Sequence, residues 1–177
     1  MRIAISGTHG SGKSTLVDDL IERLPHWESI EKPYYVLEEE GYEFGEIPTR
    51  EDFEAQLTRS LQLTSEQRRN VIFDRCPMDF VAYALCSADS ESFSVRAWLP
   101  QLRDAANALD LIVFLPIDNR IPVPLSEDDD WRIAVDETLR EILLDDTFDL
   151  EMIVLEIRGT REERVQQVLD RLSHLKN

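Results

Sequence analysis

The stretch "ISGTHGSGKST" at positions 5–15 decides the fold. Gly7, Gly12, Lys13 and Ser14 match the pattern GxxxxGK[ST], in which a glycine-rich turn joins a strand to a helix. Glycines let the backbone curl until successive N–H groups converge on phosphate oxygens, and the following helix adds the positive end of its dipole. The lysine reaches the β- and γ-phosphates, and the serine offers its hydroxyl to magnesium. The pattern therefore predicts a phosphate-binding loop over residues 7–15.

The other residues of this loop are expected to bind phosphate mainly through their backbone. They are Thr8, His9, Gly10, Ser11 and Thr15. A curled loop presents backbone N–H groups to the anion whatever side chains it carries. The side chains of His9 and Ser11 are accordingly interpreted as incidental.

Short apolar runs alternate with amphipathic stretches along the rest of the chain. The expected strands cover 2–6, 27–33, 70–74, 109–117 and 151–157. The expected helices cover 14–24, 33–44, 49–67, 78–86, 98–109, 131–144 and a segment that follows Thr160. Uninterrupted apolar strands between helices are typical of a parallel sheet covered on both faces. We therefore predict an α/β three-layer sandwich of about five mostly parallel strands, formed by a single domain over residues 1–177.

The charge of the chain limits its partners. Its 177 residues include 36 acidic and 19 basic ones, which gives a formal net charge of −17. Such a field repels polyanions, so we expect no nucleic-acid partner and no anionic membrane partner. Cys76 and Cys86 form no CxxC pair, and no apolar run approaches membrane-spanning length. With an amino terminus that lacks a signal-peptide layout, these features favour a cytoplasmic protein.

The second clear strand leads into "VIFDRCPMDF" at positions 71–80. A carboxylate at the end of an apolar strand beside a phosphate-binding loop orients magnesium or its water, and Asp74 fits that place. Arg75 follows at once and is expected to project at the mouth of the site, where it meets an anion. The alternative interpretation is that the pair caps the helix that starts near Pro77, a role to which Asp79 is better suited.

The loop "GTHGSGKST" together with "FDRCPMDF" resembles the P-loop nucleoside- and nucleotide-kinase-like group, which includes thymidylate kinases and deoxynucleoside kinases. It is also similar to small AAA-type ATPase domains grouped with the nicotinamide riboside kinase domain. The resemblance implies a P-loop NTPase fold with strand order 2-3-1-4-5. It further implies ATP and Mg²⁺ as ligands, with Lys13 on the phosphates, Ser14 and Asp74 at the metal, and transfer of the γ-phosphoryl group to a small acceptor.

The same resemblance points to an acceptor-side carboxylate. Deoxynucleoside kinases carry a Glu-Pro motif after the second strand, and this chain reads Glu31-Lys32-Pro33, with one extra residue between. Glu31 is therefore expected to contact the acceptor hydroxyl. The run Glu38, Glu39 and Glu40 supplies rivals, although a solvated helix face is their simpler interpretation.

A lid is expected over residues 118–132, because kinases of this group close such a segment after the fourth strand and bring arginines onto the transferring phosphoryl group. Arg120 and Arg132 are the candidates here. The segment has more carboxylates than cations, unlike the usual arginine-rich lid. Arg132 has an alternative interpretation as a surface residue paired with a neighbouring aspartate, namely Asp128, Asp129 or Asp136.

Adenine in this group usually rests near the loop after the last strand, which here contains Arg158, Gly159 and Thr160. The guanine-reading NKxD motif is absent, so ATP is preferred over GTP.

Two functions from different classes remain open. The first is a small-molecule kinase with a nucleoside-like acceptor, acting as a monomer or homodimer, for which the acidic surroundings favour a neutral or cationic acceptor. The second is a nucleotide-dependent switch or binding protein that hydrolyses ATP or GTP slowly.

Overall fold

A single sheet of five strands organises the molecule. The computed structural model describes residues 1–118 and 129–175. The strands are β1 (Arg2–Ser6), β2 (Glu28–Ile30), β3 (Val71–Asp74), β4 (Leu111–Phe114) and β5 (Val154–Glu156). They pair in parallel in the order β2-β3-β1-β4-β5. Both the predicted α/β class and the predicted strand order are confirmed.

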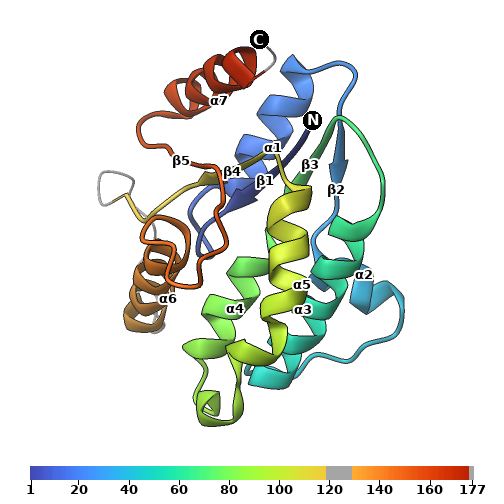
Figure 1. Ribbon diagram of the computed structural model, residues 1–177, viewed down its shortest axis with the longest axis vertical. Coiled ribbons are helices and arrows are strands. Elements are labelled where there is room, and N and C mark those ends of the chain that lie inside the picture. Colours follow the sequence, from blue (N-terminus) through green and yellow to red (C-terminus); the bar gives the residue numbers. More distant parts are fainter. Residues whose placement is uncertain (119–128, 176–177) are drawn as a thin grey trace.

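Helices connect the strands and cover the sheet (Figure 1). Before β4 the chain forms α1 (Lys13–Arg23), α2 (Pro33–Glu39), α3 (Arg50–Ser65), α4 (Pro77–Leu85), the short 3-10 helix η1 (Ser90–Ser92) and α5 (Val95–Ala108). After β4 it forms α6 (Asp129–Leu143) and α7 (Arg161–Leu175).

Alternation along β1 divides the core into two layers. Ile3 and Ile5 face α1 and α7 in one apolar cluster, whereas Ala4 faces the cluster built from α3, α4, α5 and α6. Successive side chains of a strand point to opposite faces, so the apolar centre of β1 at residues 3–5 requires cover on both sides. Figure 1 shows this arrangement, with α1 and α7 grouped on one side of the strands and α3 to α6 on the other.

Some boundaries differ from those that periodicity predicted. Helix α5 begins at Val95 rather than Trp98 and carries Pro100 within it. Helix α6 begins at Asp129, two residues before the expected start at Trp131. Most of the expected lid, including Arg120, lies outside the described residues.

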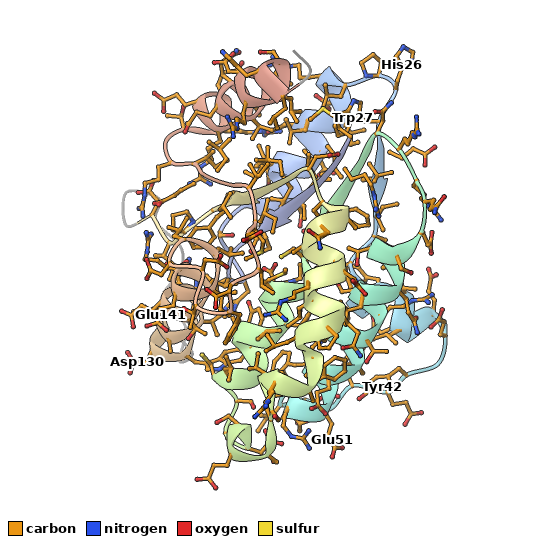
Figure 2. The ribbon with its side chains drawn as sticks, in the orientation of Figure 1. His26, Trp27, Tyr42, Glu51, Asp130 and Glu141 are labelled. Atoms are coloured by element: carbon orange, nitrogen blue, oxygen red, sulfur yellow. The ribbon has the colours of Figure 1, made fainter. Side chains whose placement is uncertain are left out.

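Acidic side chains are spread over the surface. Glu51 at the start of α3 and Asp130 and Glu141 on α6 are exposed (Figure 2). Within residues 1–118 and 129–175, no helix combines the length and apolar character needed to cross a bilayer.

The layer between the sheet and α1 gives a test of the core. Leu20 is fully buried there, whereas Leu144, just after α6, is 36% exposed. Replacing Leu20 by alanine should lower the free energy of unfolding by about 2–5 kcal/mol, because the change leaves a cavity among packed apolar groups. Urea titration followed by circular dichroism measures the effect. The matched variant Leu144→Ala should stay within about 0.5 kcal/mol of the unmodified protein, and equal losses in both would contradict the assigned core.

Candidate active site

The site forms where three neighbouring strands end. Ile5 of β1 lies opposite Asp74 of β3, and Ile30 of β2 lies opposite Phe73. The carboxyl ends of parallel strands meet at one edge of a sheet, which is where ligands bind in open α/β folds. The phosphate-binding loop leaves β1 at this edge, so it stands beside Asp74.

Two glycines explain the spacing of the loop motif. Gly7 adopts φ +146°, and a Cβ there would lie 2.4 Å from the carbonyl oxygen of Leu115 beyond β4. Gly12 adopts φ 93° as the residue that precedes the first turn of α1. Any larger residue at Gly7 would push the loop off the sheet, and the left-handed backbone at Gly12 favours glycine.

Asp79 fastens the loop to the neighbouring helix. Its side chain is fully buried, with Oδ1 accepting from the backbone N–H of Gly7 (3.0 Å) and Oδ2 accepting from the N–H of Cys76 (2.8 Å). The second bond is part of a capping box at the start of α4. The proposal that Asp79 caps this helix is confirmed, and the bond to Gly7 adds a second task that fixes the loop.

Cations turn the loop carbonyls outward. Three arginines donate to them: Arg75 to Gly7 (3.4 Å), Arg132 to His9 (3.0 Å) and Arg164 to Ser11 (3.0 Å). Hydrogen bonds from charged donors are stronger than neutral ones, so each holds its carbonyl firmly. An outward carbonyl dipole no longer opposes an anion inside the loop. Arg132 therefore lies against the loop, and the alternative interpretation, a surface residue paired with a neighbouring aspartate, does not describe this contact.

His9 is enclosed by aromatic side chains rather than left in solvent. Its backbone N–H donates to the Tyr83 hydroxyl (2.8 Å), and its ring centroid lies 5.7 Å from that of Trp131. The ring therefore packs between α4 and α6, which the interpretation of an incidental side chain did not anticipate.

Lys13 lies inside the loop with only 5% of its surface exposed. Its ammonium donates to the carbonyl oxygen of Thr8 (2.6 Å). Burial, followed by repulsion from Arg75, holds the pKa of Lys13 well below its usual value, and Lys32 adds to the repulsion while Asp79 and Asp74 oppose it. Such a desolvated cation among other cations favours the arrival of an anion.

Asp74 ends β3 with one oxygen engaged and one free. Its Oδ2 lies 3.5 Å from the ammonium of Lys32, while its buried Oδ1 has no hydrogen-bond partner among the described residues. A buried polar atom without a partner is costly and commonly marks a missing ion or water.

The same oxygen fits a magnesium site. The described residues contain no group of three or more His, Cys, Asp or Glu side chains able to hold a metal ion. Magnesium in nucleotide sites usually keeps several waters and takes one or two protein ligands besides the phosphates. Asp74 Oδ1 and the hydroxyl of Ser14, in the first turn of α1, are chemically suited to that role.

Arg75 lies against the loop and packs on side chains of α4. It adopts φ 106°, and its guanidinium packs 5.1 Å from the ring centroid of Tyr83 and 3.5 Å from Asp79. Burial alone would lower the pKa of Arg75, but Tyr83 and Asp79 outweigh it and leave the pKa above its ordinary value. Arg75 therefore stays charged and close enough to influence Lys13.

Two functional candidates were missed by sequence reasoning. Lys32 faces Asp74, whereas its neighbour Glu31 is exposed. The only available signal was the position of Lys32 directly after an expected strand. Arg164, on α7, resembles any polar residue of an amphipathic helix, and its bond to the loop depends on the packing of α7 beside α1.

The loop after β5, where adenine is expected from the sequence, is shaped by a glycine and a helix cap. Gly159 adopts φ +112°, and the N–H of Thr160 donates to Glu163 (2.7 Å) at the start of α7. A depression of about 480 Å³ is lined by Arg158, Gly159, Glu163, Gln166, Gln167 and Asp170.

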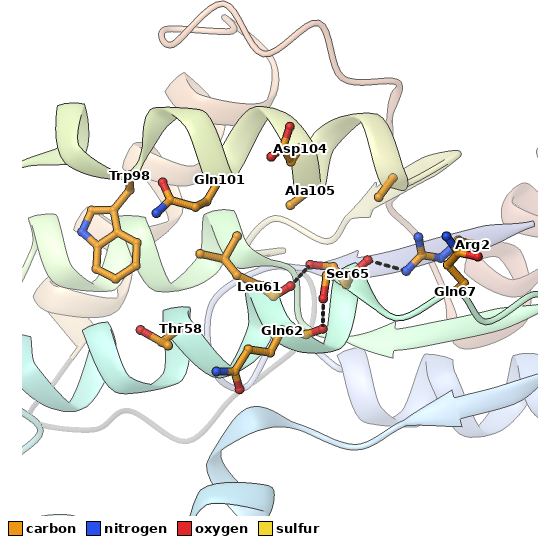
Figure 3. A pocket seen from close by; sticks show the side chains of 12 residues that line it. Arg2, Thr58, Leu61, Gln62, Ser65, Gln67, Trp98, Gln101, Asp104 and Ala105 are labelled. Atoms are coloured by element: carbon orange, nitrogen blue, oxygen red, sulfur yellow. Dashed lines mark hydrogen bonds between the residues drawn. The ribbon is translucent and has the colours of Figure 1, made fainter.

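A larger cavity lies away from the loop. It measures about 580 Å³ and is enclosed mainly by α3 and α5, with Trp98 at one end and Arg2 at the other (Figure 3). Arg2 begins β1, whereas the phosphate-binding loop follows the end of that strand. The cavity therefore opens at the opposite edge of the sheet and does not belong to this site.

Solved structures share this fold. Deoxyadenosine kinase from M. mycoides with bound dATP matches with a TM-score of 0.63 and 16% identity, over 98% of this chain and 100% of that one. Thymidylate kinase from Candida albicans matches with a TM-score of 0.66 and 16% identity, over 99% and 92%. A NadR protein in complex with NAD and AMP-PNP matches with a TM-score of 0.68 and 21% identity, over 96% of this chain and 48% of that one.

Among curated protein sequences, none matches this chain. A family model described as an AAA domain matches residues 2–164, which include the phosphate-binding loop, Asp74, Arg132 and Arg164. The fold is that of the P-loop kinases, and the chain belongs to the AAA domain family.

Proposed function

We propose that the protein is an ATP-dependent kinase that transfers the γ-phosphoryl group to a small acceptor, nucleoside-like or otherwise. Two groups at this edge of the sheet carry the proposal: the ammonium of Lys13 and the Oδ1 atom of Asp74. Lys13 is a desolvated cation without enough anionic partners, and Asp74 Oδ1 is a buried acceptor without a donor. A nucleotide phosphate gives Lys13 an anionic partner, and a metal-bound water or an acceptor hydroxyl donates a hydrogen bond to Asp74 Oδ1.

The donor side of the site holds ATP. Lys13 and backbone N–H groups of the loop bind the β- and γ-phosphates, and adenine rests by Gly159 and Thr160. The backbone N–H of His9 is not among them, because it donates to the Tyr83 hydroxyl. Ser14 and Asp74 hold Mg²⁺ directly or through water. When bound, the metal neutralises charge that develops between the β- and γ-phosphates.

Transfer then depends on positioning. The acceptor oxygen forms a bond to the γ-phosphorus while the bond to the bridging oxygen breaks, and ADP leaves. The hydroxyl proton passes to Asp74 or to solvent, with Glu31 as a second candidate base on the acceptor side. Arg75 and Arg132 add positive charge near the transferring group. Because phosphoryl transfer requires little covalent chemistry of the protein, correct placement supplies most of the rate enhancement.

One experiment separates the kinase from a nucleotide-dependent switch. Protein is incubated with γ-labelled ATP and a panel of nucleosides, nucleoside monophosphates and small hydroxy acids, and labelled products are resolved. A kinase labels at least one acceptor. Release of labelled phosphate alone, with ATP bound normally and a partner retained only in the ATP state, would instead favour the switch.

Lys13→Ala tests the loop. The variant should bind ATP about 100-fold more weakly, because it removes a charged contact to the triphosphate from a desolvated position. Isothermal titration calorimetry measures the affinity, and circular dichroism checks that the fold survives. Unchanged affinity in a folded variant would contradict the role of the loop.

Asp74→Asn tests the carboxylate. The value of kcat should fall about 10²- to 10⁴-fold, because an amide cannot take up a proton and coordinates poorly. The affinity for ATP measured without metal should change less than about threefold, since Lys13 and the loop are intact. Asp104→Asn makes the same chemical change at an exposed position on α5 and should leave kcat unaltered. A similar fall in both variants would remove Asp74 from the mechanism.

A further inference from the structure

Lys32 adds a cation to the acceptor side of the site. Strand β2 pairs in parallel with β3, so residues that follow the two strands share one edge. The ammonium of Lys32 lies 3.5 Å from Asp74 Oδ2, and the side chain keeps 26% of its surface exposed. The next residue, Pro33, is buried and begins α2, which restricts the backbone at this point. The side chain is therefore directed at Asp74 while remaining open to solvent.

The distribution of lysines makes this position unusual. The chain has only three, Lys13, Lys32 and Lys176, against 36 acidic residues. Lys32 lies 3.5 Å from Asp74, at the edge of the sheet where the phosphate-binding loop with Lys13 also begins. A partly exposed ion pair contributes little to stability, so the fold gains little from Lys32. The repulsion between cations is instead a cost that a bound anion removes.

The ammonium also retains capacity for a ligand. It has three N–H donors, and its distance of 3.5 Å from Asp74 is longer than the roughly 2.8 Å of a strong charge-assisted hydrogen bond. Asp79 does not compete for Lys32, because its two oxygens accept from the backbone N–H groups of Gly7 and Cys76. An anionic group beside Asp74 would therefore meet an available cation.

We propose that Lys32 determines acceptor specificity by binding an anionic group, a phosphomonoester or a carboxylate, that lies near the reacting hydroxyl of the acceptor. This inference rests on the proposed kinase function and narrows its substrate class. Salt screens the field of distant acidic side chains over about 8 Å at physiological ionic strength, whereas Lys32 would contact the anionic group directly. The net charge alone favours a neutral or cationic acceptor, but the contact with Lys32 favours an anionic one.

Paired acceptors test the substrate class. Initial rates are measured at saturating ATP with thymidine and deoxyadenosine, with their 5′-monophosphates, with shikimate and with nicotinamide riboside. At least one anionic acceptor should exceed every neutral or cationic one in kcat/KM by about 10-fold or more, the discrimination expected from one charge-assisted contact. The monophosphates and shikimate then distinguish phosphate from carboxylate. Equal or better use of a neutral or cationic acceptor would overturn the inference and leave the kinase assignment standing.

Variants test the residue itself. Lys32→Met should raise KM for the best anionic acceptor about 10- to 100-fold, with KM for ATP changed less than about twofold. Lys32→Arg should restore most of the acceptor affinity. The control Arg68→Met makes the same charge change at an exposed residue that pairs with Glu66 before β3, at the opposite edge of the sheet, and should leave both KM values unchanged. An unaltered acceptor KM in Lys32→Met, or a rise confined to ATP, would remove Lys32 from acceptor binding.

Equilibrium binding separates this inference from the proposed function. Calorimetry with the two monophosphates and shikimate is carried out in EDTA without ATP, on the unmodified protein and on Lys32→Met. At least one anion should bind the unmodified protein and lose about 10-fold or more in the variant. If no acceptor is phosphorylated, the kinase function is refuted, and the binding measurement still decides whether Lys32 binds an anion. The role of Lys32 is refuted if none of the three anions binds, or if an anion binds equally to the unmodified protein and to Lys32→Met.

Discussion

The hydrogen bonds that cations donate to carbonyls of the phosphate-binding loop are the constraint on which the site depends. Lys13 comes from α1, Arg75 follows β3, Arg132 lies on α6 and Arg164 on α7, and each engages a different loop carbonyl. The three arginines engage carbonyls that would otherwise oppose an anion, whereas Lys13 bonds the Thr8 carbonyl from inside the loop. Helices α6 and α7 cover opposite faces of the sheet, so a loop of nine residues is fixed by both helical layers at once.

This arrangement places a cationic centre inside a strongly acidic protein. At a net charge of −17, the outer field repels long polyanions, which span many acidic side chains. A small anion meets a different environment, because the cations around Lys13 act at short range and in a partly desolvated site, where Coulomb interactions are stronger than in water. The acidic surface and the anion-binding site are therefore compatible. The surface excludes long polyanions, whereas a small anion can still reach the cations around Lys13.

Sequence patterns predicted the features that depend on neighbours along the chain. The loop, the strands, Asp74 at a strand end and the cap at Asp79 follow from local spacing. Lys32 and Arg164 could not be found in this way, because their contacts arise from the pairing of β2 with β3 and the packing of α7 beside α1. The contacts of Arg75 with Tyr83 and Asp79 could not be predicted for a related reason, because they depend on how α4 packs beside the loop.

The two sides of the site are built differently, and this difference has a consequence for specificity. The phosphate-binding loop, on the ATP side of the proposed site, is held in place by α6 and α7. Trp131 and Arg132, in the first turn of α6, both contact His9 of the loop. The acceptor side of the proposed kinase begins at the short strand β2 and continues into the seven residues of α2. On that proposal, a change of acceptor would be accommodated around Lys32 without disturbing the bonds that hold the loop. Catalysis by positioning requires the phosphate-binding half to be rigid, whereas recognition of the acceptor requires only that its charge and shape match the other half.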